Sequence, residues 1–221
     1  MSEQFDNAMM LAMDAYRANN EEECKSFCNQ ALIIDPKSAN AKALKGAAVL
    51  ISFSLAGAES DAVEAINIWN SITDASSLTD DFKDIVIDAA FDFRSRWYKA
   101  AKEHYEEFKK VDGASSEFEN VKNAYKVFME QVVHLTWLQD YTKFLQYTVS
   151  LVQQQLANLN EVTFAKVLID ANKGKGGEVG ELTRQIEEAF AALKKRHLIK
   201  TLIITGVIVV GIIVLGVICF K

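Results

Sequence analysis

One long apolar stretch near the end of the chain constrains its architecture most strongly. Residues 201–220 read TLIITGVIVVGIIVLGVICF and contain no charged side chain. At about 1.5 Å per residue, this run makes a helix of about 30 Å, which matches the hydrocarbon thickness of a bilayer. Fourteen of the twenty residues are Leu, Ile, Val or Phe, and together they favour membrane insertion by about 4 to 8 kcal/mol. We therefore expect residues 201–220 to form a transmembrane anchor.

The charged residues are distributed unevenly around this stretch. Residues 1–193 hold all 30 acidic residues and 19 of the 24 basic ones, whereas residues 194–221 hold five basic residues and no acidic one. We expect the basic residues before the anchor to lie at the membrane surface; they are Lys194, Lys195, Arg196 and Lys200. By the positive-inside rule, this places the N-terminal body of a single-pass membrane protein on the cytoplasmic side. The acidic body also argues against nucleic acid as a partner.

The first residues and the cysteines agree with a cytoplasmic body. The opening MSEQFDNAMM has neither a basic segment nor a continuous apolar core, so we expect no secretory signal. Of the three cysteines, Cys219 lies within the predicted anchor, and Cys24 and Cys28 are one helical turn apart. Such sparse cysteines fit a reducing compartment.

The composition predicts an all-α fold. One proline and ten glycines in 221 residues favour long helices joined by short turns. In the first third of the chain, apolar residues recur at intervals of three and four, which is typical of amphipathic helices. The predicted helices cover residues 3–17, 21–34, 38–55 and 59–72 and form two antiparallel helical hairpins. The second helix is expected to stop before Pro36, because proline disfavours a helical conformation at the residue that precedes it.

The connection between these hairpins resembles a known repeat. The stretch ALIIDPKSANAKALKGAA, residues 31–48, resembles the junction between two tetratricopeptide repeats: a helix carrying Ala31, a turn at Asp35-Pro36, and Gly46 where the family uses a small residue. Small residues allow paired helices to approach closely. The resemblance covers residues 5–72 and departs from the family at Lys42 and Lys45, where an aromatic residue and Leu are usual.

The resemblance implies a protein-binding module whose first helices line a concave groove. The residues that would face this groove are Met9, Met13, Tyr16, Arg17, Ala43, Ala47 and Leu50. Met9 and Met13 stand where chaperone-binding members of the family carry Lys and Asn, which disfavours capture of a chaperone's C-terminal carboxylate. An equally good interpretation is that these residues pack against later helices as core.

Longer helices are predicted after the hairpins. One covers residues 80–110, and an apolar stripe without Gly or Pro over 116–158 predicts either one very long helix or two with an unmarked bend. The predicted domains are tetratricopeptide-like hairpins over 1–74, a long-helix bundle packed on the repeats over 75–172, a glycine hinge over 173–180, a basic juxtamembrane helix over 181–200 and the anchor over 201–220.

The sequence offers no candidate catalytic residue. No Ser, Cys or Thr stands in a recognisable nucleophile motif, and the glycine cluster at 174–180 lacks the spacing and the preceding strand of a dinucleotide site. Cys24 and Cys28 alone make an incomplete metal site. His104 and His134 lack the Glu-x-x-His spacing of di-iron bundles. We therefore expect no enzyme activity, small-molecule substrate, cofactor or metal.

These observations together predict a membrane-tethered cytosolic scaffold or adaptor, which binds a protein partner through its tetratricopeptide-like helical array. The alternative is a coiled-coil tether or fusion-type membrane protein that pairs through residues 116–158. A compact body is expected of the scaffold, and a rod-like oligomer of the tether.

Overall fold

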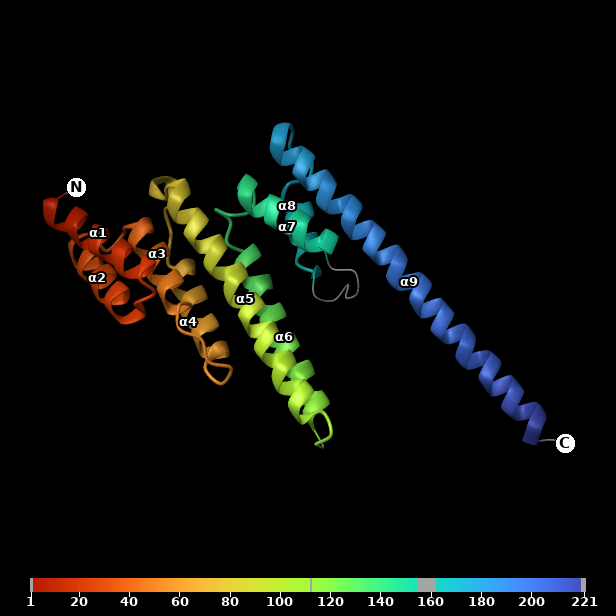
Figure 1. The fold of residues 1–221 in the computed structure, drawn as a ribbon. Coiled ribbons are helices and arrows are strands. Elements are labelled where there is room, and N and C mark those ends of the chain that lie inside the picture. Colours follow the sequence, from red (N-terminus) through yellow and green to blue (C-terminus); the bar gives the residue numbers. More distant parts are fainter. Residues whose placement is uncertain (1, 112, 155–161, 220–221) are drawn as a thin grey trace. The chain divides into compact units, whose positions relative to one another are not determined.

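The computed structural model describes residues 2–111, 113–154 and 162–219, with side chains described as far as residue 199 and at Thr201. Over these residues the regular structure is helical and contains no strand, which confirms the all-α prediction (Figure 1). The chain divides into two compact units. We call residues 1–139 the N-terminal unit and residues 140–221 the C-terminal unit.

The N-terminal unit is built from helices that pack mainly on their neighbours in sequence. Its helices are α1 (Glu3–Arg17), α2 (Glu21–Ile34), α3 (Ala39–Val49), α4 (Ala58–Asn70), α5 (Asp80–Phe108) and α6 (Ala114–Val133), with a short 3-10 helix, η1 (Ala75–Ser77), before α5. Helix α1 packs on α2, α2 on α3, α3 on α4 and α5, and α5 on α6. This order of packing is compatible with helical repeats, in which each unit contacts chiefly its neighbours.

Side-chain caps fix the starts of the first three helices. The hydroxyl of Ser2 accepts a hydrogen bond from the backbone N–H of Phe5, and the Ser38 hydroxyl accepts one from Ala41, each at 3.3 Å. Asn20 caps α2 by accepting from the N–H of Glu23 at 3.2 Å. These oxygens satisfy N–H groups that have no partner within the helix. Helix α2 ends at Ile34 as predicted.

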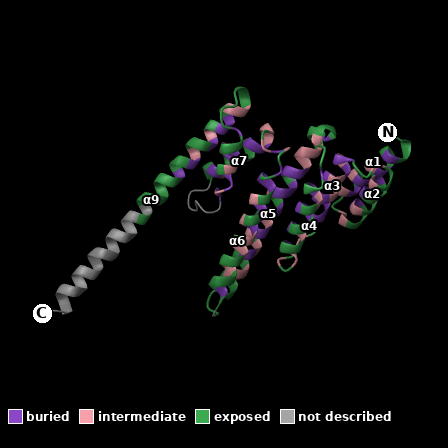
Figure 2. Ribbon diagram, turned by 180° about the vertical axis from the view of Figure 1, so that it is seen from behind, coloured by how far each residue is buried: buried purple, intermediate pink, exposed green. Residues whose placement is uncertain are grey.

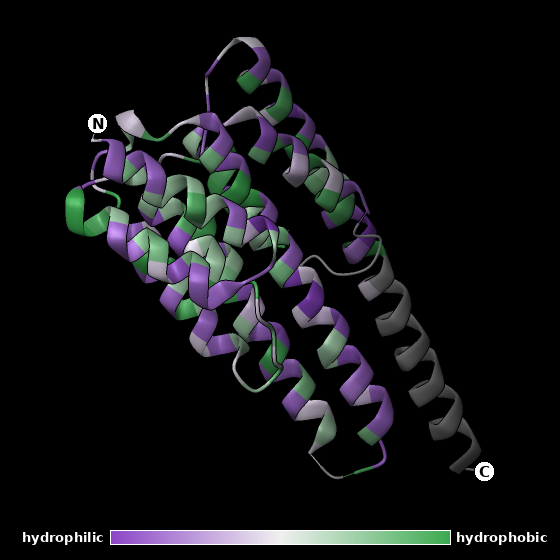
Figure 3. Ribbon diagram, turned by 60° about the vertical axis from the view of Figure 1, so that its left-hand side comes forward, coloured by the Kyte–Doolittle hydropathy of each residue, from purple (hydrophilic) through white to green (hydrophobic). Residues whose placement is uncertain are grey.

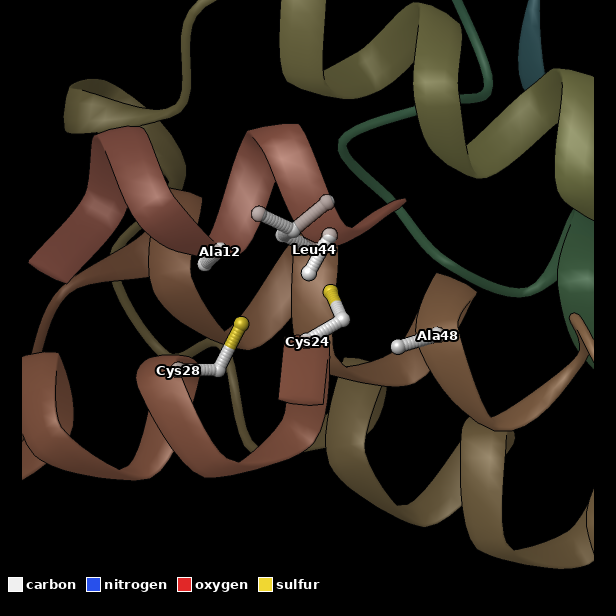
Figure 4. Packing of buried hydrophobic residues seen from close by; sticks show 6 residues of the cluster. Ala12, Cys24, Cys28, Leu44 and Ala48 are labelled. Atoms are coloured by element: carbon white, nitrogen blue, oxygen red, sulfur yellow. The ribbon is translucent and has the colours of Figure 1, made fainter. Parts of the chain in front are cut away.

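Small side chains form the centre of the first three helices. Cys24 and Cys28 on α2 point toward Ala12 of α1 and Leu44 of α3 (Figure 4). All four side chains are fully buried, and the buried residues follow the inner faces of the hairpins (Figure 2). The small residues therefore allow the close helix packing that the repeat resemblance implies. The outer faces of the helices carry most of the polar residues (Figure 3).

The largest differences from the predicted helix boundaries are at the end of α3 and within the segment 116–158. Helix α3 ends at Val49, six residues before the predicted end at Leu55. The segment 116–158 is not one helix, because α6 ends at Val133 and α7 begins at Thr142. Between them Leu135 and Leu138 are buried, and the side chain of Gln139 donates a 2.9 Å hydrogen bond to the carbonyl of Val133. Of the two alternatives, the one with two helices is therefore the one observed.

The C-terminal unit contains α7 (Thr142–Gln154), α8 (Ala165–Ala171) and α9 (Gly177–Cys219). Both α7 and α8 pack on α9. The first part of α9 buries an apolar stripe at helical spacing, formed by Leu182, Ile186, Phe190 and Leu193. A 3.2 Å ion pair joins Lys175, before α9, to Asp140, before α7.

The division into units and the start of α9 can be set beside the predicted domain ranges. The division at residue 139 falls inside the range 75–172 that was expected to form one bundle. Helix α9 already begins at Gly177, so the non-helical part of the predicted hinge over 173–180 ends at Gly176. Gly174 and Gly177 have positive φ angles of 81° and 63°, a conformation that glycine adopts without strain.

The predicted anchor lies mostly outside the part of the chain whose side chains are described. The backbone of α9 is helical as far as Cys219, but the side chains of residues 202–221 are not among those described. Among the residues that are described, no helix is both long and apolar enough to cross a membrane.

Candidate partner-binding cleft

Four of the predicted groove residues lie beside a later helix at a cleft in the N-terminal unit. The cleft has a volume of about 530 Å³. Helix α1 contributes Tyr16 and Arg17, and the end of α3 contributes Ala47 and Leu50. The opposite wall is α5, which contributes Asp88, Asp92 and Arg96.

Arg96 closes one side of this cleft by joining α5 to the end of α3. Its guanidinium donates to the carbonyls of Leu50 at 2.6 Å and Ile51 at 2.9 Å. These are carbonyls at the C-terminus of α3, where the helix dipole favours a cation. Asp92, one turn earlier on α5, pairs with Nε of Arg96 at 2.7 Å. The guanidinium also lies 5.6 Å from the centroid of the Phe53 ring, so Arg96 fixes the place where α3 stops.

The surroundings of the cleft change the pKa of Tyr16. Burial, together with the nearby carboxylates of Asp88 and Asp92, raises the pKa of its hydroxyl to about 12, against a smaller lowering by Arg96. The phenol is therefore neutral at physiological pH. It can donate and accept hydrogen bonds at a half-buried position.

The structure brings together four of the seven residues predicted to bind a partner. Tyr16, Arg17, Ala47 and Leu50 line the cleft, although Ala47 and Leu50 are each only 1% exposed. Met9 and Met13 do not line it.

The other three predicted residues take part in packing. Met9 and Met13 are half-buried and pack against the cluster around Ala12 and Leu44, to which Phe82 and Ile85 of α5 also contribute. Ala43 is fully buried, and its carbonyl accepts a 3.1 Å hydrogen bond from the indole of Trp69. For these residues the interpretation as core describes their surroundings better than the interpretation as a groove.

The sequence prediction missed the wall that α5 supplies. Asp88, Asp92 and Arg96 follow one another at intervals of four, so they share one face of a helix. This spacing predicts a charged face on the helix. It does not predict which helix packs against that face, because the carbonyls that bind Arg96 lie 45 and 46 residues earlier in the chain.

The two buried cysteines belong to the core and not to the cleft. A hydrogen bond with Cys24, together with burial, raises the pKa of the Cys28 thiol, which keeps Cys28 uncharged. Across the described residues, no three His, Cys, Asp or Glu side chains are grouped so that they could hold a metal ion.

The predicted membrane-surface residues lie on α9. Lys194, Lys195 and Arg196 are exposed, and the ammonium of Lys194 lies 5.0 Å from the ring centroid of Phe190. Lys200 is within α9, and its side chain lies outside the described residues.

Comparison with family models, with curated proteins and with solved structures found no match to this chain. The arguments for its function therefore rest on its own residues and their geometry.

Proposed function

We propose that the chain is a membrane-tethered scaffold that holds a protein partner through its array of helical hairpins. The observation that carries the proposal is the cleft between α1, α3 and α5, where Tyr16 and Arg17 remain accessible beside the carboxylates of Asp88 and Asp92. Arg17, Asp88 and Asp92 place both positive and negative charges around the half-buried ring of Tyr16. Protein–protein interfaces commonly combine an aromatic centre with a charged rim of this kind.

The apolar composition of residues 201–220 supports tethering, since twenty residues without a charge match the bilayer thickness. The basic residues from Lys194 to Lys200 support a cytoplasmic position for the units that precede them. In this proposal the anchor localises the scaffold to a membrane, and the helical hairpins bind the protein partner.

The alternative, a coiled-coil tether that pairs through residues 116–158, receives less support. A coiled coil requires an apolar seam that continues over several heptads of one helix. Helix α6 ends at Val133 and packs on α5, so the apolar side of this segment already has a partner within the chain.

The proposal is tested by photo-crosslinking the full-length chain in its native membrane, with a crosslinker placed at Asn19 beside the cleft. We expect a discrete crosslinked protein whose yield falls strongly in Arg17→Glu and is unchanged in the control Lys99→Glu. Lys99 is an exposed residue of α5 outside the cleft. Equal yields in the two variants would argue against the cleft as the binding site.

A further inference from the structure

A second groove in the N-terminal unit, separate from the cleft, lies between α4 and α6. Its volume is about 590 Å³. The base of the groove is formed by buried side chains, namely Ala62, Ile66, Trp97 and Phe128. Val63 on α4 and Val127 on α6 line the groove and remain 56% and 53% exposed. The apolar base therefore continues into apolar walls that are open to solvent.

Carboxamides surround this apolar surface. The residues concerned are Asn67, Asn70, Asn120, Asn123 and Gln131, all of which are exposed. Within the described part of the chain, none of these five side chains is hydrogen-bonded to another protein group. By contrast, the side chains of Asn20, Asn40 and Gln139 bind backbone groups of the N-terminal unit. The carboxamides around the groove are thus available to a ligand, and each offers both a donor and an acceptor.

The two walls run in the same direction. Leu55 and Ala56, just before α4, line a common pocket with Phe118 and Val121 from the first half of α6. The groove residues extend over twelve positions on each helix, from Glu59 to Asn70 and from Asn120 to Gln131. The eleven steps between the first and the last of these positions correspond to about 17 Å of helix. An extended chain at about 3.3 Å per residue places about five residues along this length.

The charge of the groove limits the kind of occupant. Among the described residues, Glu59 is the one charged side chain that lines it, and no Lys or Arg does. The nearby cations of α6 are engaged on their own helix, since Lys122 pairs with Glu119 at 2.8 Å and Lys126 with Glu130 at 3.7 Å. An anionic ligand would therefore find no counter-charge. Uncharged groups that both donate and accept hydrogen bonds fit the surface best.

We propose that the groove between α4 and α6 binds an extended, uncharged segment of a partner protein, about five residues long. Apolar side chains of the segment lie against Val63 and Val127, and the carboxamides bind its backbone N–H and C=O groups. A helical segment fits less well, because its backbone groups are already paired with one another. Extended backbone carries one free donor and one free acceptor at each residue. The inference does not depend on the cleft or on the membrane anchor.

The test uses the full-length chain in detergent micelles and a display library of random decapeptides as the probe. We expect selected peptides to carry a run of uncharged, apolar residues and to bind with an affinity that changes little with salt. Backbone N-methylation of single residues in that run is expected to weaken binding about two- to tenfold at alternate positions, as the loss of a hydrogen bond predicts.

Substitutions in the groove test whether the selected peptides bind there. Asn67→Ala and Asn123→Ala are each expected to weaken binding about two- to tenfold, and Val127→Asp is expected to abolish it. Asn7→Ala, an exposed asparagine of α1 outside the groove, is the matched control and should leave affinity unchanged. Because all four positions are exposed, tryptophan fluorescence should report the same fold in each variant.

Several outcomes would overturn the inference. One is a selection that yields no binder, or only charged peptides whose affinity falls with salt. Another is a peptide that binds as a helix and is insensitive to N-methylation, or one that the groove variants bind as well as the parent does. If the chain self-associates and Val127→Asp abolishes this self-association, the groove binds a second copy of the chain and not a peptide segment of another protein.

Discussion

The indole of Trp69 lies directly over Gly46, so that helices α3 and α4 meet where one of them has no side chain. A Cβ at position 46 would lie 2.6 Å from Cδ1 and 2.9 Å from Cε2 of the indole ring. Trp69 is fully buried and donates its Nε1–H to the carbonyl of Ala43, one turn before Gly46. The small residue of the repeat-like junction therefore admits an aromatic ring from the same hairpin.

This contact predicts that Gly46→Ala destabilises the N-terminal unit. In an open helix the change would stabilise by about 1 kcal/mol, but the overlap with Trp69 should reverse the sign and cost about 1 to 3 kcal/mol, with Gly46→Leu costing more. Chemical denaturation followed by tryptophan fluorescence measures the effect, because Trp69, Trp97 and Trp137 all lie in the N-terminal unit.

Two comparisons check the cause of that destabilisation. Gly176→Ala, where no described atom beyond the adjacent residues lies within 4 Å of the added Cβ, should leave the fluorescence transition of the N-terminal unit unchanged. In a Trp69→Leu background the cost of Gly46→Ala should shrink, since neighbouring sites that share a contact are not additive. An undiminished cost in that background would refute the steric explanation.

Arg96→Lys is predicted to destabilise the same unit although it keeps the charge. Lysine cannot reproduce the two parallel hydrogen bonds to Leu50 and Ile51, because its ammonium is a point charge without the planar fork. The expected loss in unfolding free energy is about 1.5 to 3 kcal/mol. Arg17→Lys serves as the control, since Arg17 pairs with Asp14 on the exposed surface of α1, and it should change stability by less than about 0.5 kcal/mol.

The stability of the N-terminal unit should fall at high pH because of Tyr16. Its folded-state pKa is about 12, against an ordinary value of 10.0. A group whose pKa is raised by folding contributes stability below its unfolded pKa and loses that contribution as the pH rises through the folded value. Denaturation midpoints should therefore decrease between pH 10 and about 12.

Tyr16→Phe isolates this contribution. The variant should lack the part of the decrease that Tyr16 causes, and the difference in phenolate absorbance between the two proteins should show a midpoint near pH 12. A difference titration centred near the ordinary value would mean that Tyr16 is not buried beside Asp88 and Asp92.

Deleting residues 199–221 is predicted to move the protein from the membrane pellet to the soluble fraction. The deletion removes the whole apolar run and leaves Lys194, Lys195 and Arg196 in place. Sedimentation of lysates and flotation with vesicles measure the change. A truncated chain that still floats would show that the remaining units bind lipid through a surface of their own.

Local sequence signals were sufficient where a helix boundary is set by neighbouring residues. The predicted starts of two helices, at residues 3 and 21, agree with the structure, in which Ser2 and Asn20 act as N-caps, and the end of α2 before Pro36 was predicted from the proline alone. The small residues at Ala31 and Gly46 were correctly expected to lie where helices pack closely, since both are buried.

Boundaries that depend on distant contacts could not be predicted in this way. The end of α3 at Val49 is stabilised by Arg96 from another helix, and nothing in the local pattern of α3 marks it. The end of α6 has no Gly or Pro, and it depends on Gln139 and on the burial of Leu135 and Leu138.

The candidate site, too, could be predicted only in part from the sequence. The sequence identified the α1 and α3 residues at the cleft through their resemblance to a repeat, but it could not show that α5 supplies the opposite wall. That wall explains why Met9 and Met13 serve in packing, since Phe82 and Ile85 of α5 pack on the same cluster. The carboxamides between α4 and α6 come from segments at least 50 residues apart in the sequence.

The reach of Arg96 from α5 to α3 also limits how this protein can change in length. Open helical solenoids grow or shrink by whole repeats, because each new unit offers its neighbour the same surface as the last. Here a hairpin inserted between α4 and α5 would separate Arg96 from the carbonyls of Leu50 and Ile51. The N-terminal unit is therefore expected to tolerate substitutions on its surface better than the insertion of a further hairpin at this point.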